Sequence, residues 1–101
     1  MDVLKNILSE SKDYYDDIHE KIEKRLSQLP AGSIKERKIS GKKYYYLQKR
    51  VGKKVMHNYL GKKKPESMIN QIKERNRLKK ELKKVKEAQK ILKRAKGKKH
   101  A

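Results

Sequence analysis

Three consecutive tyrosines lie inside a basic stretch of the sequence, "GKKYYYLQKRVGKKVMHNYLGKKK", at residues 41–64. Tyrosine rings can stack on nucleobases, and lysine and arginine side chains can neutralise phosphates. The residue types in this stretch therefore fit the binding of a polyanion. The alternative is that the same rings pack inside a small sheet.

Residue patterns typical of a catalytic site do not accompany the tyrosines. We find no nucleophile with a neighbouring base, no glycine loop that cradles phosphate and no paired carboxylates, so a non-enzymatic protein without a cofactor is expected. The segment "DDIHE" places Asp16, His19 and Glu20 on one helical face, but no second cluster completes a metal coordination shell. No metal site is expected.

The charge of the chain is strongly positive and unevenly distributed. Its 101 residues include 31 basic and 12 acidic residues, for a formal net charge of +19. Residues 1–28 carry five basic and seven acidic residues. Residues 29–64 carry twelve basic residues and one acidic residue, and residues 65–101 carry fourteen basic and four acidic residues. Such a surplus predicts a polyanionic partner, with nucleic acid as the first expectation.

Other sequence features point to a cytoplasmic location, free or on the nucleoid or ribosome. The chain has no cysteine, which fits a reducing compartment. No window approaches the roughly 18 apolar residues of a membrane span. The first residues, "MDVLKNILSESKD", lack the basic leader of a secretory signal.

The order of periodicities predicts one small α+β domain with the topology αβββα. Apolar residues recur at steps of three and four in the first and last segments, whereas the middle segment is rich in tyrosine, valine and isoleucine and is divided by Gly41 and Gly52, which suit hairpin turns. With 34% hydrophobic residues, the core should be small. The expected segments are an acidic helix (1–28), a three-stranded antiparallel sheet (29–64), a basic helix (65–96) and a disordered basic tail (97–101).

Alternation along the expected strands suggests two different faces. Tyr45 and Leu47, with Met56, Leu60 and either Ile34 or Ile39, form the more apolar set and are expected to pack against a helix. The opposite face would present Tyr44, Tyr46, Gln48, Arg50 and His57, while Tyr59 is a second candidate for a core ring. The reverse assignment stays open, because the pattern is mixed.

The second helix should carry a narrow apolar seam, with Arg75 and Gln89 at seam positions, flanked by rows of lysine. Residues 73–99 contain only Glu74, Glu81 and Glu87 as acids, so these rows fit contact with a polyanion better than a merely solvated face. The two helices could pair as an antiparallel hairpin within one chain, or their coiled-coil-like seams could join two chains in a homodimer.

Residues 29–61, "LPAGSIKERKISGKKYYYLQKRVGKKVMHNYLG", resemble a family of small, mostly uncharacterised prokaryotic and archaeal domains. The shared pattern is Gly-Ser, a basic strand, Gly, Tyr-Tyr-Tyr-Leu, a turn glycine and a strand that ends in Tyr-Leu-Gly. The resemblance implies an independent domain and assigns it no activity.

A looser likeness links "GSIKER" and the aromatic strand after it to the three-stranded arm-binding domains of tyrosine recombinases. Those domains insert a sheet into the DNA major groove. By analogy at this one motif, the likeness places seven residues near DNA: Arg37, Lys38, Tyr44, Tyr46, Gln48, Lys49 and Arg50.

These observations together predict a nucleic-acid-binding protein that contacts the phosphate backbone with weak sequence specificity, and they leave DNA and RNA equally open. One alternative is a small interaction or inhibitor protein, encoded by a mobile element, that occupies an acidic protein groove or a guide-RNA channel. Another is binding to anionic membranes through the second helix. The predicted nucleic-acid contacts are Arg37, Lys38, Lys42, Lys43, Tyr44, Tyr46, Gln48, Lys49, Arg50, Lys53, Lys54, Lys73, Arg77, Lys80 and Lys84.

Overall fold

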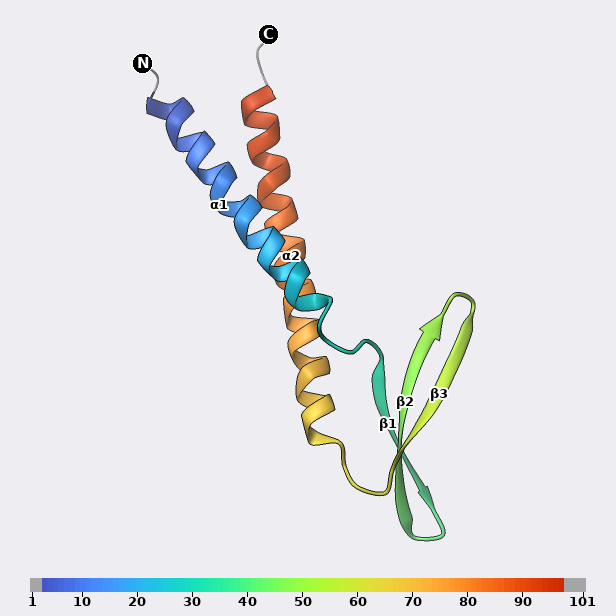
Figure 1. Ribbon diagram of the computed structural model, residues 1–101. Coiled ribbons are helices and arrows are strands. Elements are labelled where there is room, and N and C mark those ends of the chain that lie inside the picture. Colours follow the sequence, from blue (N-terminus) through green and yellow to red (C-terminus); the bar gives the residue numbers. More distant parts are fainter. Residues whose placement is uncertain (1–2, 98–101) are drawn as a thin grey trace. The chain divides into compact units, whose positions relative to one another are not determined.

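The computed structural model describes residues 3–97 and confirms the α+β fold with αβββα topology (Figure 1). The expected tail, beginning at residue 97, lies almost entirely outside the described residues. The elements are α1 (Val3–Leu26), β1 (Ser33–Ile39), β2 (Lys42–Val51), β3 (Lys54–Gly61) and α2 (Glu66–Gly97).

These elements form two compact units. The helical unit consists of α1 and the part of α2 from Arg77 onward, and the sheet unit is Leu29–Asn76. None of the described helices is long and apolar enough to cross a membrane.

The helical unit is an antiparallel pair of amphipathic helices in which the start of α1 and the end of α2 lie at the same end (Figure 1). Ile22 of α1 and Val85 of α2 are its buried apolar side chains among the described residues. The intramolecular pairing that was one of two expectations is therefore present in the chain. Its apolar contact is narrow, because the seam of α2 also holds polar residues such as Gln89.

The sheet unit contains an antiparallel meander in the order β1-β2-β3. Two-residue turns connect its strands. Ser40 and Gly41 have φ values of 52° and 80°, and Gly52 has a φ of 64°. Positive φ values at these places match the right-handed twist of paired strands, which is why turn glycines marked both hairpins in the sequence.

One face of the sheet packs against the first turns of α2, and we call it the packed face. Tyr45 of β2 is only 8% exposed, and Ile72 of α2 is also buried. Ile34 of β1, directly beside Leu47 in the register, is half-buried on the same face. The expectation that Tyr45 and Ile34 face a helix is confirmed.

Met56 of the expected apolar set does not pack there, and of the two alternatives Ile34 and Ile39 only Ile34 does. Met56 is 48% exposed, because it lies opposite Lys49, beyond the last β2 residue that β1 covers. Ile39 is 52% exposed and pairs with Lys42, on the face opposite Tyr45. Leu60 is half-buried at a bulge that breaks the β2–β3 register, so alternation does not fix its direction.

Gly32 occupies a backbone position that no other residue can fill without displacement. Its φ is 113°, and a Cβ built there would lie 2.6 Å from the Gln48 carbonyl oxygen and 3.0 Å from Leu47 Cδ1. We expect Gly32→Ala to lower the free energy of unfolding of the sheet unit by about 2 kcal/mol, measured by urea titration.

Gly41→Ala is the matched control for this prediction. Gly41 also has a positive φ, but a Cβ there would meet no atom within 4 Å. It should lose only about 1 kcal/mol through backbone strain. If the two variants lost equal free energy of unfolding, the close approach of Gly32 to β2 would not be the reason that a glycine is needed there.

Candidate nucleic-acid interface

The sheet face opposite Tyr45 collects aromatic and basic side chains from all three strands. Directly paired residues share a face, and the register pairs Arg37 with Tyr44, Lys35 with Tyr46, Gln48 with His57 and Tyr46 with Tyr59. We call this surface the ring face: Lys35, Arg37, Tyr44, Tyr46, Gln48, Arg50, His57 and Tyr59, together with Lys62, which follows β3 and lies beside the Tyr44 ring.

Three tyrosines on the ring face form a continuous cluster. The centroid of the Tyr59 ring lies 5.4 Å from that of Tyr46 and 6.2 Å from that of Tyr44, with interplanar angles of 55° and 46°. Tyr59 is 55% exposed, whereas Tyr44 and Tyr46 are half-buried. The cluster is therefore held by contacts between its own rings and remains accessible from solvent.

Two cations lie against this cluster. The guanidinium carbon of Arg37 is 5.3 Å from the Tyr46 centroid, and Lys62 Nζ is 6.0 Å from the Tyr44 centroid. Both distances are within the range of cation–π interactions. Such contacts hold positive charge beside the rings, where a phosphate attached to a stacked base would need it.

The ring face has no carboxylate among its residues. Glu36 is the acidic residue of the strands, and it lies on the packed face, where it accepts a hydrogen bond from the Tyr45 hydroxyl (3.3 Å) and pairs with Lys43 (3.4 Å). Lys35, Arg37 and Arg50 are exposed. The resulting field on the ring face is positive and uncompensated by any acid of the strands.

The structure separates the fifteen residues predicted from sequence into several groups. Arg37, Tyr44, Tyr46, Gln48 and Arg50 lie together on the ring face, and Lys42 lies on the same side at the end of the first hairpin. The remaining nine residues lie elsewhere. Lys38, Lys43, Lys49 and Lys54 alternate toward the packed face, Lys53 lies in the β2–β3 turn, Lys73 lies in the sheet-unit part of α2, and Arg77, Lys80 and Lys84 lie in the helical unit.

Four residues of this surface were absent from that list of contacts: Lys35, His57, Tyr59 and Lys62. The sequence placed His57 on this face without naming it as a contact. Tyr59 was considered a candidate core ring, and that interpretation is wrong, because it pairs with Tyr46 on the exposed face. Alternation from Tyr46 across the sheet could have identified Lys35. Lys62 could not be identified in this way, because it follows the bulge that shifts the register between Tyr45 and Tyr46.

A family of domains of unknown function, DUF6788, matches residues 12–68, which is more than half of the chain. The chain belongs to the DUF6788 family. This membership confirms the resemblance to a small uncharacterised domain family. No curated protein and no solved structure matches the chain.

The DUF6788 match includes the complete sheet and therefore the whole ring face with Lys62. It begins inside α1 and ends at residue 68, in the first turn of α2. The lysine rows of α2 lie beyond its end. The ring face thus lies within the residues that match the family, while most of α2 lies outside them.

Two of the three residues that resembled metal ligands, Asp16 and His19, take part in a hydrogen-bond network. His19 Nδ1 lies 2.8 Å from Gln89 Oε1, and His19 Nε2 lies 2.7 Å from Glu23 Oε1. Gln89 Nε2 donates to Asp16 Oδ1 at 2.9 Å, which joins α1 to α2. Among residues 3–97, no group of three or more histidine and acidic side chains could hold a metal ion.

The hydrogen bonds of the network shift the pKa values of His19 and Asp16. The acceptors Gln89 and Glu23 favour imidazolium, which can donate from both nitrogens, and they raise the pKa of His19, with nearby Lys86 opposing them. Hydrogen bonds from Lys12 and Gln89 lower the pKa of Asp16. Because the folded pKa of His19 exceeds its ordinary value of 6.5, its contribution is complete below that pH and is lost as pH rises through the folded pKa.

We therefore expect the melting temperature of the helical unit to fall between pH 6 and pH 8.5, as followed by circular dichroism at 222 nm. His19→Gln should flatten this decrease, since it removes the titrating group. His57→Gln, a change in the sheet unit, leaves the network in place and is the matched control. A decrease that persists in His19→Gln would assign the pH dependence to another group.

Proposed function

We propose that this DUF6788 protein is a non-enzymatic nucleic-acid-binding protein and that the ring face is its contact surface. The observation that carries the proposal is the combination, on one side of a three-stranded sheet, of three clustered rings with several cations and no carboxylate. Aromatic rings beside positive charge are how proteins grip single-stranded nucleic acid without reading its sequence.

The roles of individual residues follow from their chemistry. Lys35, Arg37, Arg50 and Lys62 neutralise phosphates and release counterions. The ring cluster stacks on unpaired bases, and Gln48 contacts a base edge in this proposal. In support, Gln48 is half-buried on the same face and pairs with Ser33 and His57 in the register. Weak sequence preference is expected, because lysine acts as a mobile point charge and carries little geometric information.

The other predicted cations act over a longer range in this proposal. Lys73, Arg77, Lys80 and Lys84 are exposed on α2, as are the lysines on the packed side and turns of the sheet. With the chain at +19, they raise the rate of encounter with a polyanion and add backbone contacts. We expect this role to be exercised in the cytoplasm.

The experiment that tests the proposal is a salt series with nuclease-treated protein and matched double-stranded DNA, single-stranded DNA and structured RNA. Neutralisation by the four ring-face cations alone predicts a slope of log K against log salt of about −3 to −4. Arg37→Gln, which removes one phosphate contact, should reduce that slope by about one. Lys79→Gln, on α2, is the matched charge control.

Two outcomes would count against the proposal. Weak binding to all three nucleic acids, with an affinity that does not change with salt, would reject the proposal. It would favour an acidic protein groove as the partner. Binding that is as strong in a variant lacking all four ring-face cations would show that the contact surface lies elsewhere.

A further inference from the structure

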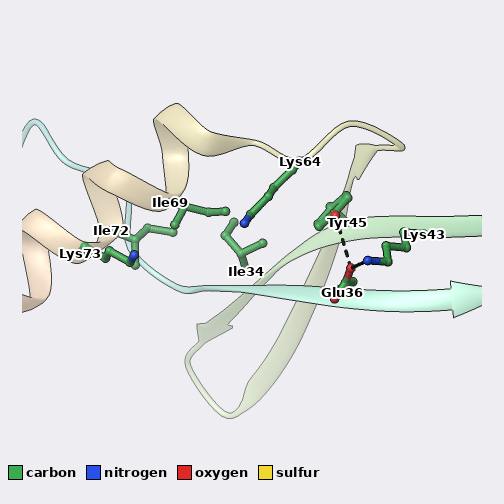
Figure 2. A pocket seen from close by; sticks show the side chains of 8 residues that line it. All are labelled: Ile34, Glu36, Lys43, Tyr45, Lys64, Ile69, Ile72 and Lys73. Atoms are coloured by element: carbon green, nitrogen blue, oxygen red, sulfur yellow. Dashed lines mark hydrogen bonds and ion pairs between the residues drawn. The ribbon is translucent and has the colours of Figure 1, made fainter.

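The packed face of the sheet unit contains a cavity of about 480 Å³. It lies between β1, β2 and the start of α2, on the opposite side of the sheet from the ring face (Figure 2). Its volume is in the range of pockets that bind small molecules. None of the ring-face residues lines it.

The lining combines an apolar floor with charged groups. Ile34 from β1 and Ile69 and Ile72 from α2 supply the floor, and the Tyr45 ring is also part of the lining. Figure 2 shows the Lys64 side chain extending toward Ile34 and Ile69, and Lys73 beside Ile72. A ligand in this space would therefore meet branched aliphatic carbon and ammonium groups close to one another.

The charges of the lining are not balanced. Three lysines and one glutamate contribute, which leaves a net charge of +2. Glu36 is already engaged by Lys43 and by the Tyr45 hydroxyl. Lys64 and Lys73 have no ion-pair partner among the described residues. Two ammonium groups beside apolar surface are therefore available to an anion from outside the chain.

We propose that this cavity binds a small organic anion with an apolar body, such as an aryl or branched aliphatic carboxylate, sulfonate or phosphate ester. Lys64 and Lys73 bind the anionic group, and the three isoleucines with Tyr45 contact the body. An inorganic anion would leave the isoleucine floor uncovered, and a neutral apolar ligand would leave both ammonium groups without an anion.

The cavity and the ring face can be occupied at the same time. Side chains alternate along β2, so Tyr45 points into the cavity while Tyr44 and Tyr46 point to the opposite side. The cavity proposal does not depend on nucleic-acid binding. A chain that failed to bind nucleic acid could still bind the anion.

The test compares two fluorescent probes with the same aromatic rings, using the full chain. 8-Anilinonaphthalene-1-sulfonate carries an anionic group, and N-phenyl-1-naphthylamine lacks it. We expect saturable binding of the sulfonate at one site per chain. Replacing both Lys64 and Lys73 by glutamine should weaken sulfonate binding about tenfold, the size of a charge-assisted contact, and leave the neutral probe unchanged.

Lys79→Gln/Lys83→Gln is the matched control, because it removes the same charge from an exposed part of α2 in the helical unit. The control should bind the sulfonate within twofold of the unchanged protein. Equal weakening in both double variants would overturn the proposal and assign the binding to the overall positive charge. The proposal would also be overturned if saturation with the sulfonate left the methyl NMR signals of Ile34, Ile69 and Ile72 unshifted.

Discussion

Replacing Tyr44, Tyr46 and Tyr59 together by alanine is expected to weaken binding to single-stranded nucleic acid by about 100-fold or more. Each base that stacks on an aromatic ring contributes about 1–3 kcal/mol, and 1.4 kcal/mol is a factor of ten in affinity. The ring centroids of Tyr44 and Tyr46 both lie within 6.2 Å of that of Tyr59, so the three rings form one cluster that adjacent bases could contact. Their effects should not be simply additive.

The effect on duplex DNA should be much smaller, because duplex bases are already stacked on one another and the cations alone contact the phosphates. Fluorescence anisotropy with a labelled oligonucleotide, alone and annealed to its complement, measures both affinities. A similar loss for both forms would mean that the rings position the cations and do not stack on bases.

Two matched variants separate ring chemistry from loss of structure. The triple change to phenylalanine keeps the aromatic faces and removes the hydroxyls, so it should bind within about threefold of the unchanged protein if stacking dominates. Tyr14→Ala removes a tyrosine from α1 that is 62% exposed, close to the 55% of Tyr59. It should have no effect on the affinity for nucleic acid. If the triple alanine variant kept its affinity and its circular dichroism spectrum, the ring face would not be the interface.

The parts of this fold that could be predicted from sequence are those set by local periodicity. Gly41 and Gly52 marked the hairpins because two-residue turns need positive φ. Tyr44 and Tyr46 were assigned to one face and Tyr45 to the other because side chains alternate along a strand. These rules need no knowledge of distant residues, and they located most of the ring face.

The parts that could not be predicted depend on register and on pairing between distant segments. The bulge between Tyr45 and Tyr46 brings Lys62 near Tyr44, and no local pattern marks that bulge. Gln89 reaches Asp16 and His19 only because α1 and α2 pair in one particular alignment. Opposite charge on the two helices favours pairing, but it does not choose the alignment.

The basic residues among the predicted contacts were chosen by counting charges, and the register divides those in the strands between the two faces of the sheet. Twelve basic residues in a 36-residue segment cannot all lie on one face of a three-stranded sheet, because successive side chains alternate. Lys38, Lys43, Lys49 and Lys54 therefore alternate to the other side. Composition predicts how much charge a segment carries, whereas register decides which charges act together.

Tyr45→Ala is expected to lower the free energy of unfolding of the sheet unit by about 3 kcal/mol, the usual result of removing a buried aromatic ring. The reason is the small size of the core. In the described part of the sheet unit, only Leu29, Tyr45 and Ile72 are buried, so little packing remains to compensate for the cavity. Urea titration followed by NMR of β2 and β3 amides measures the loss in that unit.

Tyr45→Phe is the matched control, since it keeps the ring and removes only the long hydrogen bond of 3.3 Å to Glu36. It should lose less than about 1 kcal/mol. Because β2 carries Tyr45 on one side and Tyr44 and Tyr46 on the other, loosening the packed face should also disorganise the ring face. Tyr45→Ala should therefore weaken nucleic-acid binding without altering any contact residue, whereas full affinity in a destabilised variant would show that binding does not require the intact sheet.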